Sequence, residues 1–456
     1  MCGIAGAVGS ESEARVNRML DRIQHRGPDG RGIKDHGGVV HGHVRLALVD
    51  LTAASSQPFT REGSTLTFNG EVWNFRELRK KLEAQGEIFQ TCGDTEVLAA
   101  MLNRHGLECL PQIDGMFAFA WSSRNGESWL VRDSFGKIPL YVSKTKSGYE
   151  WASERKAFSD GVRPIAVAPG HAFNLKTGKW VRWYQLPKKT SCGPEDVLSH
   201  LREGVRKRLS ADAPVCCLIS GGLDSSIILA LAKESRREVV AFTAVFERNS
   251  EDARSARRLC SDLSVPLVEV PLKLSDSAVL DAVRAIEIPS KAQIEIAILC
   301  LPLARRISAD GFKACLSGEA ADELFGGYGN FCIKASKASE RELIELRKEQ
   351  LAKMARGNFV RCNKAFMAFG VECRLPFMEQ GLVESAVQLG KNESPTGKVL
   401  LKNAVRDLLP RWVVKRIKDT FQGGSGLSDA IQNRVASPIK FYNSEIRKIF
   451  GYIPKD

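Results

Sequence analysis

The chain has 456 residues, which is more than one ordinary hydrophobic core accommodates and predicts two domains of about 150 to 250 residues each. Hydrophobic residues make up 43% of it and charged residues 26%, values that are typical of a soluble globular protein and exclude a disordered or fibrous one. The formal net charge is +13, but lysine and arginine are scattered and their densest groups recur at helical spacing, which argues against nucleic-acid binding.

Twelve cysteines are spread along the chain without the spacing of a disulfide framework or a zinc site. Several lie in apolar runs, where a small buried thiol is the expected role. The N-terminal segment lacks a signal-peptide pattern, and no apolar run reaches the length of a membrane span. We therefore expect a cytoplasmic protein in a reducing environment that binds neither membrane nor nucleic acid.

Short strands separated by turn residues dominate residues 1 to about 185. The predicted strands are Ile4–Val8, Val44–Val49, Thr65–Phe68, Phe117–Trp121, Trp129–Arg132 and Tyr149–Ala152. Helices are predicted near Phe75–Ala84 and Thr95–His105. Because strands outnumber helices and several pair as hairpins, this half is predicted to be an α+β sandwich.

The segment Leu186–Pro194 breaks the periodicity and is predicted to be a linker. The sequence pattern after it is different. Helices and short apolar strands then alternate, which predicts a parallel sheet with helices on both faces. The predicted strands are Val215–Ile219, Val239–Phe246, Leu267–Val270 and Phe312–Leu316. One predicted helix ends near Leu209, a second begins at Ser225, and a third spans Ala253–Leu263. Ligands of such sheets bind beyond the carboxyl ends of the strands. The last 120 residues or so are predicted to be mostly helical, with a helix at Val405–Leu409 and a loop at Gly423, Gly424 and Gly426.

Cys2 is a candidate nucleophile because it follows Met1 and precedes the small residue Gly3. Removal of Met1 would give Cys2 both a thiol and an α-amine, and an amine that titrates near pH 8 can act as its general base. The simpler interpretation is that Cys2 is only the second residue of a strand.

Polar residues at strand ends and turns could form a pocket for glutamine around Cys2. Asn69 and the Gly70 backbone N–H are suitable donors for an oxyanion hole. Arg45 suits the carboxylate of a free amino acid, and Glu71 and Asp94 suit its ammonium. Each of them, taken alone, is equally explained as a turn residue.

Four segments, in order, resemble the glutaminase half of class II amidotransferases, which have an N-terminal nucleophile. They are Met1-Cys2-Gly3-Ile4-Ala5-Gly6, His25-Arg26-Gly27-Pro28-Asp29-Gly30, Asn69-Gly70-Glu71 and Asp114-Gly115-Met116-Phe117-Ala118. The resemblance implies that Cys2 is the nucleophile, that Asn69 and Gly70 form the oxyanion hole, and that Arg45, Glu71 and Asp94 hold glutamine.

A glycine- and serine-rich loop follows the predicted strand Val215–Ile219 and opens a helix. Its residues are Ser220, Gly221, Gly222, Leu223, Asp224, Ser225 and Ser226. Backbone amides at a helix N-terminus bind phosphate oxygens, whereas the lysine of a Walker A loop is missing. The loop resembles the PP-loop of ATP pyrophosphatases, which cleave ATP between its α and β phosphates.

Two later segments complete the pattern. Ser317 and Gly318 lead from another predicted strand into Glu319, Asp322 and Glu323, whose carboxylates suit Mg²⁺. An acidic helix N-terminus is the alternative explanation of the acids. Lys418, beside a glycine loop, could neutralise a departing pyrophosphate, although a surface lysine is also an ordinary feature.

Together, these segments resemble the glutamine-hydrolysing asparagine synthetase family over nearly the whole chain. The resemblance implies an N-terminal-nucleophile glutaminase domain at residues 1–186 and an ATP-pyrophosphatase synthetase domain at residues 195–456. ATP and Mg²⁺ would serve as cofactors, with Asp224 and Asp322 as metal ligands, Glu319 as the acid/base for ammonia attack, and Lys418 as the pyrophosphate partner. Aspartate would be adenylated and amidated to asparagine, with release of glutamate, AMP and pyrophosphate.

The acceptor is where the resemblance thins. Glu295 lies near the position at which the family carries an arginine that helps to hold aspartyl adenylate, and such a charge reversal disfavours a dicarboxylate. An alternative is therefore an amidotransferase or ligase for another carboxylate, in natural-product, glycan or nucleotide tailoring. A regulatory relative or an RNA-modifying PP-loop protein is a third option. The expected partners are glutamine and the acceptor, and a homodimer is one option for assembly.

Overall fold

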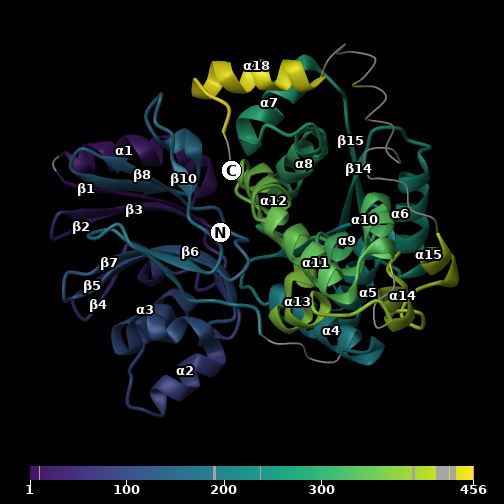
Figure 1. Cartoon of the computed structure of the whole chain (residues 1–456), viewed down its shortest axis with the longest axis horizontal. Coiled ribbons are helices and arrows are strands. Elements are labelled where there is room, and N and C mark those ends of the chain that lie inside the picture. Colours follow the sequence, from purple (N-terminus) through teal and green to yellow (C-terminus); the bar gives the residue numbers. More distant parts are fainter. Residues whose placement is uncertain are drawn as a thin grey trace.

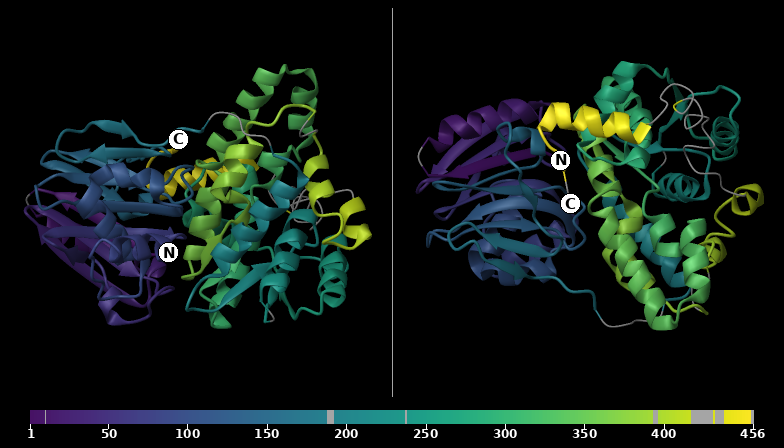
Figure 2. Two further views of the ribbon diagram at one scale, coloured as in Figure 1. Left: turned by 90° about the horizontal axis from the view of Figure 1, so that it is seen from below. Right: turned by 45° about the horizontal axis from the view of Figure 1, so that its top comes forward.

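The computed structural model describes residues 1–9, 11–187, 192–236, 238–392, 396–416, 431 and 438–454. An N-terminal half built mainly of strands lies beside a C-terminal half rich in helices, and the N-terminus lies between them (Figure 1). Two rotated views show the same boundary between the halves (Figure 2).

Two six-stranded sheets form the N-terminal half, with strand orders β10-β8-β9-β1-β3-β2 and β12-β11-β7-β6-β5-β4. All neighbouring strands in them are antiparallel. The strands are β1 (Gly3–Val8), β2 (Gly30–His36), β3 (Val39–Arg45), β4 (Phe59–Arg61), β5 (Ser64–Val72), β6 (Gly115–Ser122), β7 (Ser128–Arg132), β8 (Tyr141–Thr145), β9 (Gly148–Ala152), β10 (Ile165–Ala166), β11 (His171–Asn174) and β12 (Trp180–Arg182).

Helices cover the outer faces of this pair of sheets (Figure 1). Helix α1 (Ser12–Ile23) packs on β1 and β3, and α2 (Phe75–Glu83) and α3 (Asp94–His105) lie on the side of the second sheet. The sequence analysis missed α1, although its buried residues have the spacing of an amphipathic helix. They are Val16, Met19, Leu20 and Ile23.

A parallel five-stranded sheet, ordered β15-β14-β13-β16-β17, organises the C-terminal half. Its strands are β13 (Val215–Leu218), β14 (Ala241–Val245), β15 (Leu267–Pro271), β16 (Ala314–Leu316) and β17 (Glu372–Arg374). The helices are α4 (Pro194–Leu209), α5 (Leu223–Ser235), α6 (Glu251–Asp262), α7 (Asp276–Ile286), α8 (Lys291–Ala309), α9 (Ala321–Phe325), α10 (Gly329–Lys337), α11 (Glu340–Met354), α12 (Asn358–Met367), α13 (Gln380–Ala386), α14 (Val399–Ala404), α15 (Arg411–Lys415) and α18 (Pro438–Phe450).

These sheets confirm the predicted fold class, an α+β sandwich followed by an α/β parallel sheet with a helical C-terminal part. Two predicted elements are wrong. The strand Val44–Val49 is not continuous, because β3 ends at Arg45, whose guanidinium instead bonds carbonyls of the loop that follows. The helix Val405–Leu409 is a series of turns, because α14 already ends at Ala404 and Pro410, which has no N–H to donate, follows at once. The predicted glycine loop lies outside the described residues.

Buried charges join the two halves. The Glu287 carboxylate of the C-terminal half accepts hydrogen bonds from the backbone N–H groups of Arg155, at 3.0 Å, and Lys156, at 2.8 Å. It also forms an ion pair with Lys364 in which both side chains are fully buried. A buried ion pair is favourable only when its remaining hydrogen-bonding groups are satisfied. The halves are therefore held in a fixed register, since moving them apart would deprive Glu287 of the N–H donors of Arg155 and Lys156.

Within the ranges that the structure describes, no helix is long and apolar enough to cross a membrane. All twelve cysteines are free thiols.

Candidate active site

Cys2 lies at the start of β1, in a buried position between strands β3 and β5. Its backbone N–H donates to Asn69 Oδ1 at 2.9 Å, and its Sγ lies 3.8 Å from the Leu46 carbonyl oxygen. Arg26 Nε donates to the Cys2 carbonyl at 2.9 Å. Burial raises the pKa of the Cys2 thiol, whereas the N-terminal ammonium lowers it. A buried neutral thiol needs a base to become a nucleophile, and the predicted base, the α-amine of Cys2, would be free only after removal of Met1.

Asn69 and Gly70, the two residues predicted to form the oxyanion hole, are consecutive on β5. Asn69 Nδ2 donates to Ser153 Oγ at 3.3 Å, which leaves its carbonyl oxygen on the Cys2 N–H. Gly70 has a φ of +154°, and a Cβ added there would lie 2.1 Å from the Met116 carbonyl oxygen. Only glycine fits this position, so β5 can pass close to β6 beside Cys2.

The three residues predicted to hold glutamine lie around Cys2 and the N-terminus. Asp94 begins α3 and accepts a hydrogen bond from the Val72 N–H at 2.9 Å, and burial raises its pKa to about 6. Burial raises the pKa of Glu71 as well. Arg45 donates to the Asp50 and Thr52 carbonyls at 2.5 and 2.7 Å, and it lies close enough to Cys2 to lower the pKa of the thiol.

Two residues of β17 join this cluster from the C-terminal half, and the sequence analysis assigned neither of them a role. Arg374 Nη2 lies 3.2 Å from Glu71 Oε1, and Glu372 forms an ion pair with the N-terminal ammonium. Both side chains are fully buried. The cluster of charged side chains around Cys2 thus includes a strand about 370 residues away, for which the local sequence carries no signal.

The second cluster lies at the carboxyl ends of β13 and β16. The loop from Ser220 to Gly222 leads into α5, where the Ser226 hydroxyl donates to the Gly222 carbonyl at 2.7 Å. Gly221 has a φ of +72°, and a Cβ there would lie 2.6 Å from the Ser255 Cβ. Ser225 Oγ lies 3.1 Å from Ser220 Oγ. The loop is compact and presents the N-terminus of a buried helix, which suits phosphate oxygens.

Ser317 and Gly318 pack directly against this loop. A Cβ on Gly318 would lie 2.7 Å from the Ser225 backbone nitrogen, so the two loops touch through backbone atoms. The predicted nucleotide-binding residues Ser220, Gly221, Gly222, Leu223, Asp224, Ser225, Ser226, Ser317 and Gly318 therefore occupy one end of the parallel sheet.

The two predicted metal ligands meet on a lysine. Lys398 Nζ lies 2.6 and 2.7 Å from the two Asp224 carboxylate oxygens and 2.6 Å from Asp322 Oδ1. Both carboxylates can thus reach one cation. Mg²⁺ favours one or two carboxylates together with phosphate oxygens and water, and this donor set fits it. The sequence analysis did not single out Lys398, since nothing marks this lysine among the others of the chain.

Glu319 lies in a hydrogen-bonded network next to the nucleotide-binding loops. Asn358 Nδ2 donates to Glu319 Oε1 at 2.7 Å and to Glu323 Oε1 at 2.8 Å, and the Arg361 guanidinium forms an ion pair with Glu319. Gln293 Oε1 accepts from Arg361 Nη1 at 2.7 Å. Burial and the neighbouring Glu319 raise the pKa of Glu323 to about 7.

Two other predicted positions, Glu295 and Lys418, remain predictions. Glu295 is buried in α8 and lies 3.4 Å from Lys291 in an ion pair, so its interpretation as an acceptor-binding residue stays a prediction. Lys418 lies outside the described residues. Arg416, which the sequence analysis did not consider, donates to the Gly221 carbonyl at 2.7 Å and so reaches the nucleotide-binding loop.

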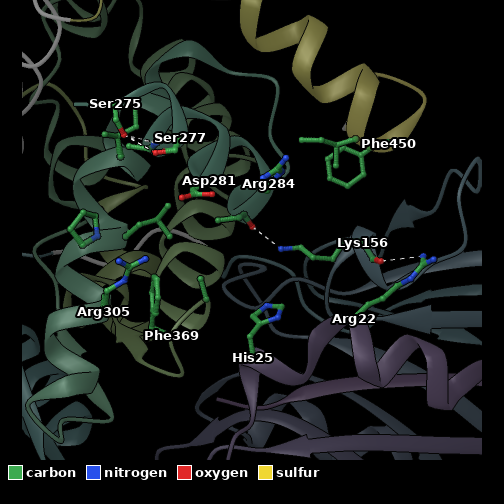
Figure 3. Close-up of a pocket in the computed structure, with 17 residues that line it drawn as sticks. Arg22, His25, Lys156, Ser275, Ser277, Asp281, Arg284, Arg305, Phe369 and Phe450 are labelled. Carbon is green, nitrogen blue, oxygen red and sulfur yellow. Dashed lines mark hydrogen bonds between the residues drawn. The ribbon is translucent and has the colours of Figure 1, made fainter. Parts of the chain in front are cut away.

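A surface cavity of about 670 Å³ opens between the halves, away from both clusters. Figure 3 shows His25, Lys156 and Arg22 of the N-terminal half on one side, and Arg305 and Phe369 on the other. No predicted site residue lines it, so the clusters are defined by their chemistry and not by this cavity.

Comparisons with known proteins identify a family for each half of the chain. A family described as a glutamine amidotransferase domain matches residues 1–170, and one described as asparagine synthase matches residues 196–352 and 333–450.

A glutamine-hydrolysing asparagine synthetase of Sandersonia aurantiaca is 31% identical, over 94% of this chain and 88% of that protein. Asparagine synthetase 2 of Arabidopsis thaliana is 32% identical, over 94% of this chain and 80% of that protein. A solved glutamine phosphoribosylpyrophosphate amidotransferase from B. subtilis matches only weakly, with 18% identity, coverage of 76% of this chain and 79% of that chain, and a TM-score of 0.37. The chain belongs to the asparagine synthase family of glutamine-hydrolysing, amide-forming enzymes.

Proposed function

We propose that this chain hydrolyses glutamine at Cys2 and uses the ammonia to amidate a carboxylate that ATP has activated as an acyl-adenylate. The leading acceptor is aspartate, so the products are asparagine, glutamate, AMP and pyrophosphate. The names of the curated relatives support this acceptor. Residues 1–186 are the glutaminase domain and residues 195–456 the synthetase domain, and the free thiols suit a reducing cytoplasm.

One observation carries the proposal: β17 contacts both clusters. The Arg374 guanidinium faces Glu71 in the Cys2 pocket, while its carbonyl oxygen accepts a hydrogen bond from the Ser317 N–H at 3.0 Å beside the nucleotide-binding loop. The two proposed half-reactions therefore share one strand, and ammonia released at Cys2 would have to pass β17 to reach the adenylate.

In the first half-reaction, the Cys2 thiolate attacks the glutamine side-chain carbonyl. Asn69 and Gly70 stabilise the oxyanion, and Arg45, Glu71 and Asp94 bind the α-carboxylate and α-ammonium of glutamine. In the second, the loop from Ser220 to Ser226, with Ser317 and Gly318, binds ATP.

Asp224 and Asp322 would hold Mg²⁺, which neutralises phosphate charge when it is bound. Glu319 accepts a proton from the attacking ammonia, and the charge of Lys418 would neutralise the departing pyrophosphate.

A second acceptor class is favoured by the charges around Glu319. Glu319 and Glu323 share one Asn358 amide, and the buried Arg361 is already paired with Glu319. Another carboxylate group on the acceptor would meet like charge here. A monocarboxylate is therefore the alternative to aspartate.

The test is incubation of the purified protein with glutamine, ATP, Mg²⁺ and aspartate. The expected products are asparagine, AMP and pyrophosphate in equal amounts. Glutamate release without asparagine would reject aspartate, and a screen of other carboxylates by pyrophosphate release would then identify the acceptor. If no carboxylate released pyrophosphate, the synthetase assignment itself would be wrong.

A further inference from the structure

The N-terminus is held by residues of the C-terminal half. Met1 is 1% exposed, and its ammonium lies 2.5 Å from Glu372 Oε2. Its sulfur accepts a hydrogen bond from Asn363 Nδ2 at 2.9 Å. The N-terminus lies accordingly at the boundary between the halves in every view (Figures 1 and 2).

Glu372 is the carboxylate in direct contact with this amine. Its other oxygen accepts a hydrogen bond from Arg374 Nε at 2.5 Å. Burial lowers the pKa of the nearby His43 to about 3, which leaves this imidazole uncharged. The charged or titratable groups that surround the N-terminus are Glu372 and Arg374 on β17, Glu71 on β5, Asp94 on α3, Arg45 and His43 on β3, and Arg26, which is paired with Glu154.

Removal of Met1, on which the proposed function depends, takes away one of the two cationic partners of Glu372. A buried carboxylate that loses a partner is strongly disfavoured. The new N-terminal amine is the Cys2 nitrogen, one residue away, which already faces Asn69 Oδ1. The space that Met1 leaves between Cys2 and Glu372 allows that ammonium to replace the old one.

We propose that Glu372 is a positioning residue for glutamine hydrolysis: the C-terminal half supplies the carboxylate that orients the Cys2 α-amine and sets the pH at which this amine becomes a base. This inference rests on the proposed function of Cys2. It makes the glutaminase incomplete without the synthetase half, because no residue that the structure describes between 1 and 186 provides this contact.

The charge of Glu372 determines the sign of the effect. A carboxylate beside an amine favours its protonated form, so more alkaline conditions are needed to generate the neutral base. Replacing Glu372 with glutamine removes this negative charge and takes away one of the two carboxylates that balance the positive charge of Arg374. Both changes favour the neutral amine, so the acid limb of glutamine hydrolysis moves to lower pH.

The experiment is the pH profile of kcat/KM for glutamine hydrolysis in the full-length Glu372→Gln variant. The acid limb is expected to move down by about one to three pH units, the range for one charge within 4 to 6 Å. Glu345→Gln, at an exposed glutamate of α11, is the matched control and should leave the limb in place. Mass spectrometry of each protein establishes that Met1 has been removed.

An unmoved limb in Glu372→Gln overturns the inference. Ammonia-dependent synthesis by the same variant reports on folding, because it does not need the Cys2 amine. If that activity is also lost, the same pH profile is measured for Glu372→Asp. The shorter aspartate carboxylate lies farther from the amine, so the acid limb must still move to lower pH, but by a smaller amount. Absence of glutamine hydrolysis in the unmodified protein would instead refute the proposed function.

Discussion

The two clusters differ in how their charged side chains are paired. Around Cys2, acidic and basic side chains from both halves are buried together, and Glu71, Glu372 and Arg374 partner one another. At the nucleotide-binding loops, backbone amides and hydroxyls dominate, and Lys398 bridges the acids Asp224 and Asp322. The first cluster is prebuilt from side chains that already pair with one another. In the second, Lys398 occupies the position between Asp224 and Asp322 that a metal ion would take in the proposed function.

The difference predicts that the two activities can be separated by mutation, most completely at Cys2. Cys2→Ala should lower glutamine-dependent synthesis by at least about 10³-fold, because the nucleophile is lost. Synthesis from free ammonia should stay near the unmodified rate, since the second cluster is untouched. Asparagine formation with each nitrogen source measures both.

Cys92→Ala, at an exposed cysteine, is the control and should change neither activity. Equal loss of both activities in Cys2→Ala would mean that the clusters are not independent.

The opposite separation is expected at Asp322. Asp322→Asn removes one of the two carboxylates that face Lys398 and should lower ATP–pyrophosphate exchange by about 10²-fold. Glutamine hydrolysis should change less than twofold, because Asp322 contacts no residue of the Cys2 cluster among the bonds described. Asp407→Asn, at a highly exposed position, serves as the control. Exchange at an unchanged rate would remove Asp322 from the metal site.

The smallest effect concerns the titration of the prebuilt cluster. Burial raises the pKa of Asp94 to about 6, so this carboxylate gains a proton as the pH falls from 7 to 5. A neutral Asp94 attracts the glutamine ammonium less. The Kd for glutamine should rise about tenfold over this interval, measured by calorimetry on Cys2→Ala, which cannot turn over. Asp94→Asn in the same background should bind weakly at both pH values, and an equally steep pH dependence there would assign the titration to another group.

The parts of both clusters that a single short segment encodes were predictable from the sequence. Ser220 to Ser226 form a loop at a strand end, and Cys2 and the pair Asn69 and Gly70 lie on or next to the predicted strands, because strand and turn patterns specify local geometry. The contact between Cys2 and Asn69 joins strands of two different sheets. The fold class followed from the same alternation of elements.

The missing parts depend on contacts between distant segments. Strand β17 has three residues, of which Glu372 and Arg374 are charged, and it is too short to carry a periodic pattern. The N-terminal ammonium and Glu71, with which these two residues form ion pairs, belong to the other half of the chain. Lys398 contributes through a position that only the folded chain brings to Asp224 and Asp322. Helix α1, by contrast, was visible in the spacing of its apolar residues and was overlooked.

The burial of Met1 against β17 also limits when during biosynthesis an aminopeptidase can reach the N-terminus. An aminopeptidase must draw the N-terminus into its own active site, which a residue only 1% exposed does not permit once the halves have docked. Glu372 is translated about 370 residues after Met1, roughly 20 to 75 s later at ordinary elongation rates. In the proposed function, removal of Met1 would therefore occur on the nascent chain, and a chain that folded before this removal would keep the Cys2 amine blocked.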